Sequence, residues 1–484
     1  MTTETAPTAP TEASRGITTR TRAPGWGTLV LLAAVQLMVV LDTTIVNVAL
    51  PTIQSGVGFR AGSIAWVVNG YALTFGALLL FGGRSGDLLG RRTVFIAALG
   101  AFALASMVAG LSINPGMLVA ARVGQGAAAA FAQATALSLI VSTFPEGRAR
   151  NRAVGVFAAM EGLGAALGLV LGGILVDAAS WRWVFLVNVP AAVVVALLTQ
   201  RFIAASPRQR IRVDLPGAAT ASLGLGLIVF GLSQASVHGW IGPWTLLPLA
   251  VGALAVGSFV LIEARSRSPL IPLWVFADRN RGGAYLIQAL MGAALFGMFF
   301  LSSLFLQQVL GYSALAAGAA FVPSTVIMMA GAGAASRIVG RTGVRPLVAG
   351  GACAAAIGML LLSQLSPHSS YLTGVMLPLI LLSGGLGATF VPLTLAAMSG
   401  AGEEHSGLVS GVSTTSIQIG GSIGVAILAT VAATTTAGLP HDLPAWIALT
   451  DGYDHAFRTG AIIIAAAVPI AMAFLRLRPT TTDG

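Results

Sequence analysis

Three ionisable residues stand inside long apolar stretches of the sequence: Asp42, Arg122 and Glu161. A charge at the centre of a lipid bilayer costs about 2.5 to 3.5 kcal/mol on insertion scales, so such residues are usually paired, face a water-filled cavity or take part in function. A carboxylate in that setting can carry a proton, because burial and a nearby arginine act on its proton affinity in opposite directions. The chemistry to expect is proton transfer or ion pairing within a membrane.

Asp42 and Arg122 are expected at a similar depth in that membrane. Asp42 lies in the second half of the first apolar stretch and Arg122 lies near the start of the fourth, and these two stretches cross in opposite directions. Both residues therefore belong to the outer half, where we predict an ion pair between them. Two interpretations follow: a carboxylate that exchanges protons during function, or a static buried ion pair.

Helical spacing sorts the neighbouring polar residues by face. On the fourth stretch, the face typical of a cavity lining carries Arg122, Gln125, Gly126, Ala129 and Gln133. On the first stretch, the polar stripe consists of Gln36, Thr43 and Asn47. Asp42 lies about 100° away from that stripe on an ideal helix. The sequence therefore leaves open whether Asp42 faces the same cavity.

Glu161 shares a helix face with a row of small residues, namely Gly164, Gly168 and Gly172. Small residues let two helices approach closely in lipid, where no hydrophobic drive favours their association. We therefore predict a close helix contact along this seam. Glu161 itself is either a second site for a proton or a cation beside the seam, or a structural hydrogen-bonding group.

The composition is that of an integral membrane protein. The 484 residues are 56% hydrophobic and 9% charged, with a mean hydropathy of +0.88. Because a helix needs about 20 apolar residues to cross the hydrocarbon, the sequence predicts an all-α membrane protein with fourteen spans. They begin near residues 26, 62, 93, 116, 152, 183, 216, 244, 283, 314, 346, 373, 406 and 457.

The chain has a net charge of +10, and its basic side chains are all arginines, since it has no lysine. All of the 26 arginines lie in the expected cytoplasmic tails and loops, except Arg60, Arg122, Arg182 and Arg458. This positive-inside bias predicts a multi-pass protein of the cell membrane with both termini in the cytoplasm, and no nucleic-acid partner. The lack of lysine removes the lysine of an ATP-binding P-loop. No metal-ligand spacing is present either, so we expect no enzyme activity and no cofactor other than a proton gradient.

Two charged connections, 201–218 and 263–283, divide the spans into a 6+2+6 plan. Transporters are often built from repeated halves with a site between them at mid-membrane. The predicted units are a disordered cytoplasmic tail (1–25) and a six-helix bundle (26–204), followed by two inserted helices with flanking cytoplasmic loops (205–282). A second six-helix bundle (283–476) and a cytoplasmic tail (477–484) complete the chain.

Four local patterns are shared with a known family. One is the loop motif after the second span, formed by Gly83, Asp87, Gly90, Arg91 and Arg92. The others are Arg122, Gln125 and Gly126 in the fourth span, the stretch from Leu41 to Pro51, and WRWVFLVNVP at 181–190. With these motifs the chain resembles the major facilitator superfamily, and within it the fourteen-span drug/proton antiporters of the EmrB/QacA type. The resemblance implies the major facilitator fold and a charge cluster at Asp87 that stabilises one conformation.

The fifth span also resembles the antiporter motif of that family. The matching glycines are Gly155, Gly164, Gly168, Gly172 and Gly173. Leu169 stands where the motif has proline. Without that proline the helix keeps an amide donor and should bend less at this point.

The resemblance implies proton-driven efflux of lipophilic or cationic drugs by alternating access, with Asp42, Arg122 and Glu161 coupling proton movement to transport. We expect no ionisable residue inside the spans of the C-terminal half, and a roomy, weakly selective cavity. Its candidate lining residues are Asn47, Gln125, Gln133, Gln288, Phe299 and Gln418. The alternatives are a proton-coupled uptake carrier of the same fold and a membrane receptor or scaffold that transports nothing.

Overall fold

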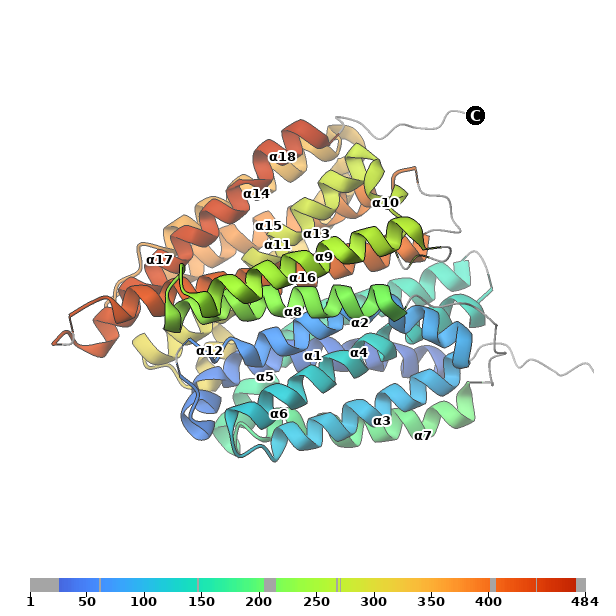
Figure 1. Ribbon diagram of the computed structural model, residues 1–484, viewed down its shortest axis with the longest axis horizontal. Helices are drawn as coiled ribbons and strands as arrows, with labels where there is room; N and C mark the ends of the chain where they lie inside the picture. Colours follow the sequence, from blue (N-terminus) through green and yellow to red (C-terminus); the bar gives the residue numbers. More distant parts are fainter. Residues whose placement is uncertain are drawn as a thin grey trace, which may run out of the picture.

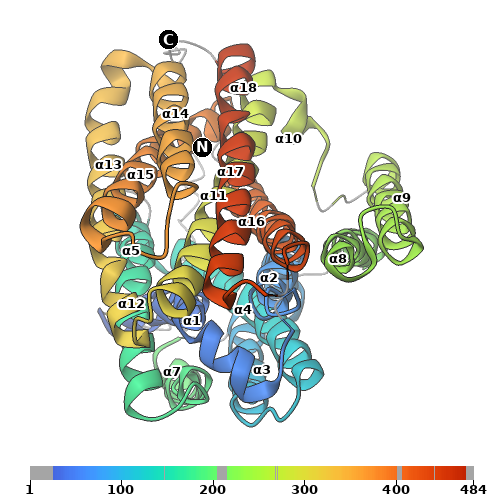
Figure 2. The same ribbon diagram turned by 90° about the vertical axis from the view of Figure 1, so that its left-hand side faces the viewer.

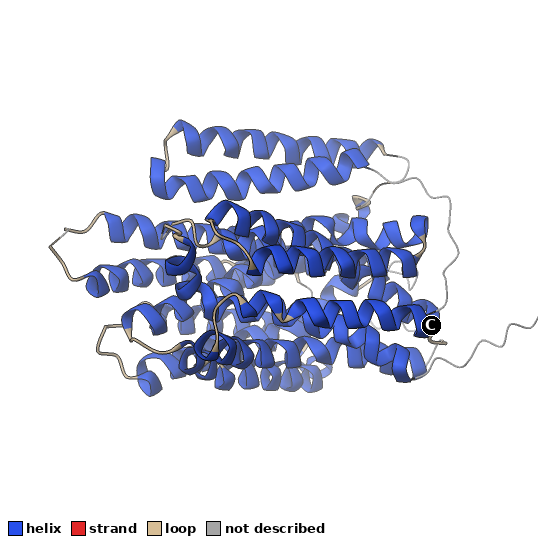
Figure 3. Ribbon diagram, turned by 90° about the horizontal axis from the view of Figure 1, so that it is seen from below, coloured by secondary structure: helices blue, strands red, loops and turns tan. Residues whose placement is uncertain are grey.

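The computed structural model describes residues 26–60, 62–145, 148–203, 215–266, 269, 271–400, 406–440 and 442–475. Within these ranges the chain forms helices, turns and loops, with no strand (Figure 3). Thirteen of the described helices are long and apolar enough to cross a membrane. The remaining predicted span corresponds to α2, a helix of 24 residues in which Trp66–Leu79 is an apolar stretch. The all-α membrane architecture is thus confirmed, and thirteen of the fourteen predicted spans are found among the described residues.

The first helices pack into one bundle, in which α1 contacts α5 while α4 contacts both α2 and α3. Its helices are α1 (Trp26–Val57), α2 (Trp66–Leu89), α3 (Arg91–Gly110), α4 (Pro115–Thr143), α5 (Arg148–Ala178), α6 (Trp183–Leu186) and α7 (Asn188–Phe202). The short α6 and α7 together make the sixth apolar span.

The last helices pack into a second bundle, in which α11 contacts α16 while α14 contacts α15 and α17. Its elements are α10 (Trp274–Ala277), α11 (Arg279–Leu304), the π-helix η1 (Phe305–Val309), α12 (Ala314–Ala320), α13 (Val322–Thr342), α14 (Val344–Leu362), the π-helix η2 (Tyr371–Met376), α15 (Leu377–Met398), α16 (Ser406–Ala437), α17 (Ala445–Ala465) and α18 (Ala467–Phe474).

Two further helices, α8 (Leu215–His238) and α9 (Pro243–Arg265), form a hairpin beside the bundles (Figure 2). The two helices approach closely at glycines. A Cβ atom on Gly224 would lie 2.9 Å from the backbone N of Val256. The hairpin contacts α2 and α16 through α8, whereas α9 packs mainly against α8. These inserted helices therefore adjoin both bundles without lying between them.

The last long helix begins earlier than the sequence pattern predicts. It starts at Ala445 rather than near residue 457, so Asp451, Asp454 and Arg458 lie within a span. The prediction that the C-terminal half has no ionisable residue in a span is therefore wrong. The first turns of α17 are amphipathic, with Tyr453 buried and neighbouring polar side chains partly exposed. Such turns contain no uninterrupted apolar run that would mark them as part of a span.

The helix α1 begins, and α18 ends, at one end of the molecule, which we name the terminal end; the opposite end is the distal end (Figure 1). The two bundles diverge toward the terminal end (Figure 1). One hydrophobic core runs from Ile45–Ile64 in the N-terminal bundle into the C-terminal bundle, whereas the core around Leu29–Val39 stays within the N-terminal bundle. Buried apolar contact between the bundles is therefore concentrated at the distal end.

The contact between α2 and α4 depends on a glycine. A Cβ atom on Gly126 would lie 2.2 Å from the carbonyl oxygen of Tyr71, which is backbone and cannot rotate away. We predict that Gly126→Ala lowers the free energy of unfolding by about 1–3 kcal/mol, the usual range for overpacking. Thermal unfolding of the purified protein measures the change.

Gly100→Ala is the matched control, because its new methyl group would meet nothing within 4 Å. We expect the control to unfold at or slightly above the wild-type temperature, since alanine favours a helix over glycine. Equal destabilisation by both substitutions would contradict the prediction.

Candidate functional site

The predicted ion pair between Asp42 and Arg122 is present. Nη1 of Arg122 donates to Oδ2 of Asp42 at 2.6 Å. The side chain of Arg122 is 1% exposed and that of Asp42 is 0% exposed. Nε of Arg122 donates to the backbone oxygen of Val67 at 2.8 Å. Charge-assisted hydrogen bonds of this length are among the strong ones, and a fully buried pair needs them to offset its desolvation.

Two amide side chains also donate hydrogen bonds to Asp42. Its Oδ1 accepts from Nδ2 of Asn188 at 2.8 Å and from Nε2 of Gln125 at 3.2 Å. Nε2 of Gln125 also donates to Oγ of Ser106 at 2.8 Å, while its Oε1 accepts from Nη1 of Arg122 at 3.0 Å. Both carboxylate oxygens are therefore hydrogen-bonded. We name Asp42, Arg122, Gln125, Asn188 and Ser106 the buried polar network.

Aromatic rings enclose the guanidinium group of Arg122. Its carbon centre lies 4.4 Å from the ring centroid of Tyr71 and 5.8 Å from that of Phe185. These distances allow cation–π attraction. The partners of Arg122 and Asp42 thus come from α1, α2, α4, α6 and α7. Asp42 faces the interior of the N-terminal bundle, and this placement answers the question that its helix face left open.

Local sequence signals set the position of Arg122. The α4 helix begins with Pro115 at its first turn, and the side chain of Asn114 caps it by accepting from the backbone N of Met117 at 2.9 Å. Proline and an Asn cap are typical of a helix start. Arg122 follows within two turns, which puts it in the distal half of the span at the depth of Asp42.

The predicted small-residue seam of α5 contacts α1 beside Asp42. Cβ atoms on Gly164, Gly168 and Gly172 would lie within about 3 Å of α1. The shortest of these distances is 1.9 Å, between a Cβ atom on Gly168 and Oγ1 of Thr44. Gly173 instead faces α12, where a Cβ atom would lie 2.4 Å from Cα of Leu315. The fifth glycine, Gly155, has nothing within 4 Å. Four of the five motif glycines therefore lie at close helix contacts.

Glu161 lies outside the buried polar network. Its side chain is exposed on α5, and it has no ion pair or hydrogen bond with any residue that the structure describes. The next residue, Gly162, faces Met329 of α13 in the other bundle. Glu161 is therefore a free carboxylate at mid-span, close to the facing bundle.

Hydrogen bonds join the two bundles at the distal end. Oγ of Ser303 donates to the carbonyl of Asn47 at 2.6 Å, and Nε2 of Gln307 donates to that of Val48 at 3.0 Å. The carbonyl of Asn47 is available because Pro51, four residues later in α1, has no N–H to bond it. The proline thus creates an acceptor that the C-terminal bundle uses.

A second pair of contacts extends this joint. Nε2 of Gln308 donates to Oε1 of Gln54 at 2.9 Å, and the hydroxyl of Tyr453 donates to Oε1 of Gln308 at 2.8 Å. The π-helix η1 carries both Gln307 and Gln308, and such π-turns are frequent at functional sites. The residues of these two contact sets form what we name the distal cluster: Asn47, Val48, Gln54, Ser303, Gln307, Gln308 and Tyr453.

A cavity of about 710 Å³ lies at the distal end between α1, α11, α16 and α17. Its volume is in the range of drug-binding pockets. Its polar groups include Gln54, Gln308 and Tyr453, and most of its wall is apolar, including Phe300 and Leu304. Gln308 and Tyr453 were not predicted from the sequence. The available signal was a polar pair, Gln307–Gln308, at the end of an apolar helix.

The residues predicted to line a substrate cavity are not among those that line the distal cavity. Gln125 belongs to the buried polar network, and Asn47 belongs to the distal cluster through its carbonyl. Phe299 is buried against Phe321, with ring centroids 5.3 Å apart, so that its neighbour Phe300 lines the cavity instead. Gln288 is buried, and its Oε1 has no hydrogen-bond partner among the described residues. Gln133 and Gln418 are half-buried.

Residues 32–425 match the family described as the Major Facilitator Superfamily. The chain belongs to this superfamily. It is 40% identical over 460 residues to the cephamycin export protein CmcT of Amycolatopsis lactamdurans, covering 93% of each chain. It is 40% identical over 459 residues to the puromycin resistance protein pur8 of Streptomyces alboniger, covering 93% of this chain and 90% of the relative.

Solved structures agree on the fold of this superfamily member. A bacterial homologue of the human lysosomal transporter Spinster, in an inward-facing and unoccupied conformation, superposes with a TM-score of 0.66 at 15% identity, covering 94% of this chain and 98% of that one. At this identity the likeness concerns the fold. The chain is therefore a multi-pass membrane protein with the helical architecture of the superfamily.

The superfamily loop motif joins α2 to α3 at the terminal end. Gly90 has a φ of 92°, which favours glycine. Arg91 Nη1 donates to the carbonyl of Ser138 in α4 at 3.2 Å, and Arg92 Nη2 donates to that of Gln200 in α7 at 3.0 Å. The arginines therefore tie three helices of the superfamily fold together.

The other two residues of this motif contribute less to the described contacts. Gly83 faces α4, where a Cβ atom on the glycine would lie 3.9 Å from Cβ of Ala134. That distance is an ordinary van der Waals contact, so the packing does not require a glycine there. The side chain of Asp87 lies outside the described part of the structure, and its expected charge cluster stays a prediction.

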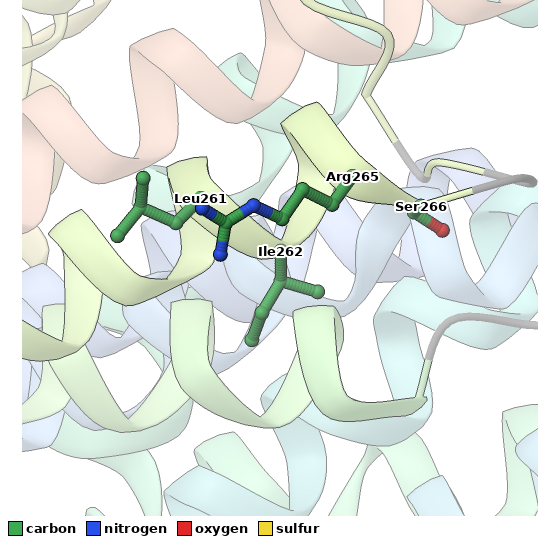
Figure 4. A pocket seen from close by; sticks show the side chains of 4 residues that line it. All are labelled: Leu261, Ile262, Arg265 and Ser266. Atoms are coloured by element: carbon green, nitrogen blue, oxygen red, sulfur yellow. The ribbon is translucent and has the colours of Figure 1, made fainter.

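A second hollow, of about 340 Å³, lies at the end of α9 (Figure 4). Its lining consists of Leu261, Ile262, Arg265 and Ser266. These residues belong to the inserted hairpin and its following loop, away from the contact between the bundles. The hollow is therefore not a candidate for the central site of a superfamily transporter.

The buried polar network predicts a characteristic stability pattern. Removing one charge from a buried pair leaves the other uncompensated, at a cost of about 3–5 kcal/mol. We therefore expect Arg122→Gln to unfold at a much lower temperature than the wild type. The double variant Asp42→Asn/Arg122→Gln, which removes both charges, should recover most of that loss in thermal unfolding. A double variant no more stable than Arg122→Gln would show that the pair is not what the single substitution disrupts.

Proposed function

We propose that this protein exports small lipophilic molecules in exchange for protons by alternating access. The observation that carries the proposal is the buried ion pair of Asp42 and Arg122, a proton acceptor held inside one bundle by several helices. Such ionisable pairs within spans are typical of proton relays in transporters. The names of the two relatives, an export protein and a resistance protein, support an outward direction and drug-like substrates.

The arginine distribution supports placing both termini, and so the terminal end, in the cytoplasm. Because the buried contact and the hydrogen bonds between the bundles described above lie at the distal end, the proposal takes this conformation as closed on the outside. A substrate would enter between the bundles from the cytoplasm or the inner leaflet. The distal cavity of about 710 Å³ lies on the side where the substrate would leave.

Exchange requires the proton to enter from the outside and to leave into the cytoplasm. In the outward-open state, a proton on Asp42 removes the charge that pairs with Arg122, so the buried polar network would rearrange and the substrate would leave. Asp42 lies on the same helix as Asn47 and Val48, whose carbonyls bond the C-terminal bundle when the distal end is closed. A shift of α1 would therefore carry the change to the distal cluster. Loss of the proton to the cytoplasm then restores the ion pair of the present conformation.

Glu161 is our candidate for a second proton or cation site. It is exposed at mid-span, near the facing bundle, and has no partner among the described residues. A free carboxylate in that position would attract a cationic substrate or take up a proton in its place. Its contribution would then depend on the charge of the substrate.

We expect Glu161→Gln to reduce transport of a lipophilic cation several-fold and to leave transport of a neutral compound nearly unchanged, because glutamine keeps the shape but not the charge. Accumulation of ethidium and of a neutral fluorescent dye in everted membrane vesicles measures the two rates. Equal losses for both compounds would assign Glu161 to the coupling or to the packing rather than to cation binding.

Transport by Asp42→Asn in everted membrane vesicles tests the proposed coupling. Wild-type vesicles with an imposed proton gradient should accumulate ethidium or puromycin, and the variant should fall to the level seen without a gradient, because asparagine cannot carry the proton. Uptake measured by ethidium fluorescence or radiolabelled puromycin, at matched protein levels, gives the result.

Asp451→Asn provides the control, since it removes a half-buried carboxylate of α17 that lies outside the buried polar network. It should accumulate both compounds as the wild type does. Gradient-driven movement in the opposite direction would favour an uptake carrier. Unchanged accumulation by Asp42→Asn would exclude the proposed coupling.

A further inference from the structure

The corner at the terminal end where α10 meets α11 holds an arginine with unused hydrogen-bond donors. Arg281 is 7% exposed, and its Nε and Nη1 are buried without a hydrogen-bond partner among the described residues. A buried charge that is not paired is strongly unfavourable, since it has lost water and gained nothing in return. An anion that accepts hydrogen bonds from this guanidinium group would offset that cost.

A second unpaired donor lies one helical turn away. Tyr285 is 3% exposed, and its buried hydroxyl also has no hydrogen-bond partner within the described ranges. Residues four apart lie on the same face of a helix, so this hydroxyl is on the side of Arg281. The ring of Trp274 lies 5.0 Å from the guanidinium carbon, and the ring of Phe276 lies 5.7 Å from that of Tyr285. The two rings of α10 hold both donors in place.

The charge around this corner is positive. Among the described residues, Asp278 is a carboxylate at this corner, and it caps α11 by accepting from the backbone N of Arg281 at 2.9 Å. Arg279 and Arg345 reach the same corner and donate to the carbonyls of Ala473 and Met472 at the end of α18. These contacts with neutral carbonyls leave three guanidinium charges close together, so the corner attracts an anion.

The surface beside the donors is apolar. Leu273, Trp274 and Phe276 are exposed on or next to α10, which lies beside α11 and α18 at the end of the spans (Figure 2). Tryptophan at such a position is typical of the membrane interface. An anion with an attached hydrocarbon chain would satisfy both the buried donors and this surface.

We propose that this corner binds one anionic phospholipid of the leaflet at the terminal end. Its phosphate accepts hydrogen bonds from Arg281 and Tyr285, and an acyl chain covers Leu273 and Phe276. A basic pocket beside interfacial aromatic residues is a recognised form of lipid-headgroup site. The site is separate from the buried polar network, which lies in the other bundle.

Native mass spectrometry of the purified full chain tests the proposal. Phosphatidylglycerol should remain bound to the wild type about tenfold more than phosphatidylcholine. Both lipids have the phosphate, but the choline cation of phosphatidylcholine is repelled by the guanidinium groups of the corner. Arg281→Gln should lower phosphatidylglycerol binding to the level of phosphatidylcholine. Arg279→Gln is the matched control, because it removes a neighbouring charge from an exposed side chain that donates to a backbone carbonyl and not to the phosphate. It should lose much less of the preference than Arg281→Gln.

Two further arms make the result decisive. Tyr285→Phe removes only the hydroxyl and should weaken phosphatidylglycerol binding several-fold even if Arg281→Gln fails to fold. Inorganic phosphate at millimolar concentration should not displace the lipid, because it lacks the acyl chain. Displacement by phosphate would indicate a free-anion site and overturn the lipid assignment, as would equal losses in Arg281→Gln and Arg279→Gln, or no loss in Tyr285→Phe.

Discussion

The structure depends on one electrostatic constraint, which is that a carboxylate and a guanidinium group are both fully buried in the interior of one bundle. Asp42 and Arg122 are fully buried, so each must be satisfied by a nearby group. The surrounding bundle supplies these groups: amides from Gln125 and Asn188, and aromatic rings from Tyr71 and Phe185. Close helix contacts at glycines bring the helices near enough for these bonds to form.

This constraint links the interior of one bundle to the joint between the two. Asp42 and the carbonyls of Asn47 and Val48 lie on one continuous helix, so a change in the ion pair and a change at the distal cluster share a rigid element. Pro51 gives that helix an acceptor without an internal partner. Coupling through a shared helix needs no chain of intervening side chains, only two arrangements of α1.

The sequence predicted those features that follow from depth and spacing. Membrane depth alone predicted the pair of Asp42 and Arg122, and glycine spacing predicted the close contact of α5. Asn188 could not be assigned to Asp42, because its position depends on how α6 and α7 meet. The start of α17 was missed because an amphipathic helix end has no uninterrupted apolar run. Helical spacing put Gln125 on a polar face, but could not distinguish a cavity from a hydrogen-bonded bundle interior.

The leucine at the position of the motif proline has a physical consequence in this chain. Leu169 is fully buried, and α5 runs without interruption from Arg148 to Ala178. A Cβ atom on Gly318 of α12 would lie 2.2 Å from the carbonyl of Leu169, so the other bundle contacts α5 closely at this residue. A proline there would remove an amide donor from the helix and bend it. The uninterrupted helix instead packs against α12, and Asp177 extends that contact by accepting from the backbone N of Ala314 and Leu315.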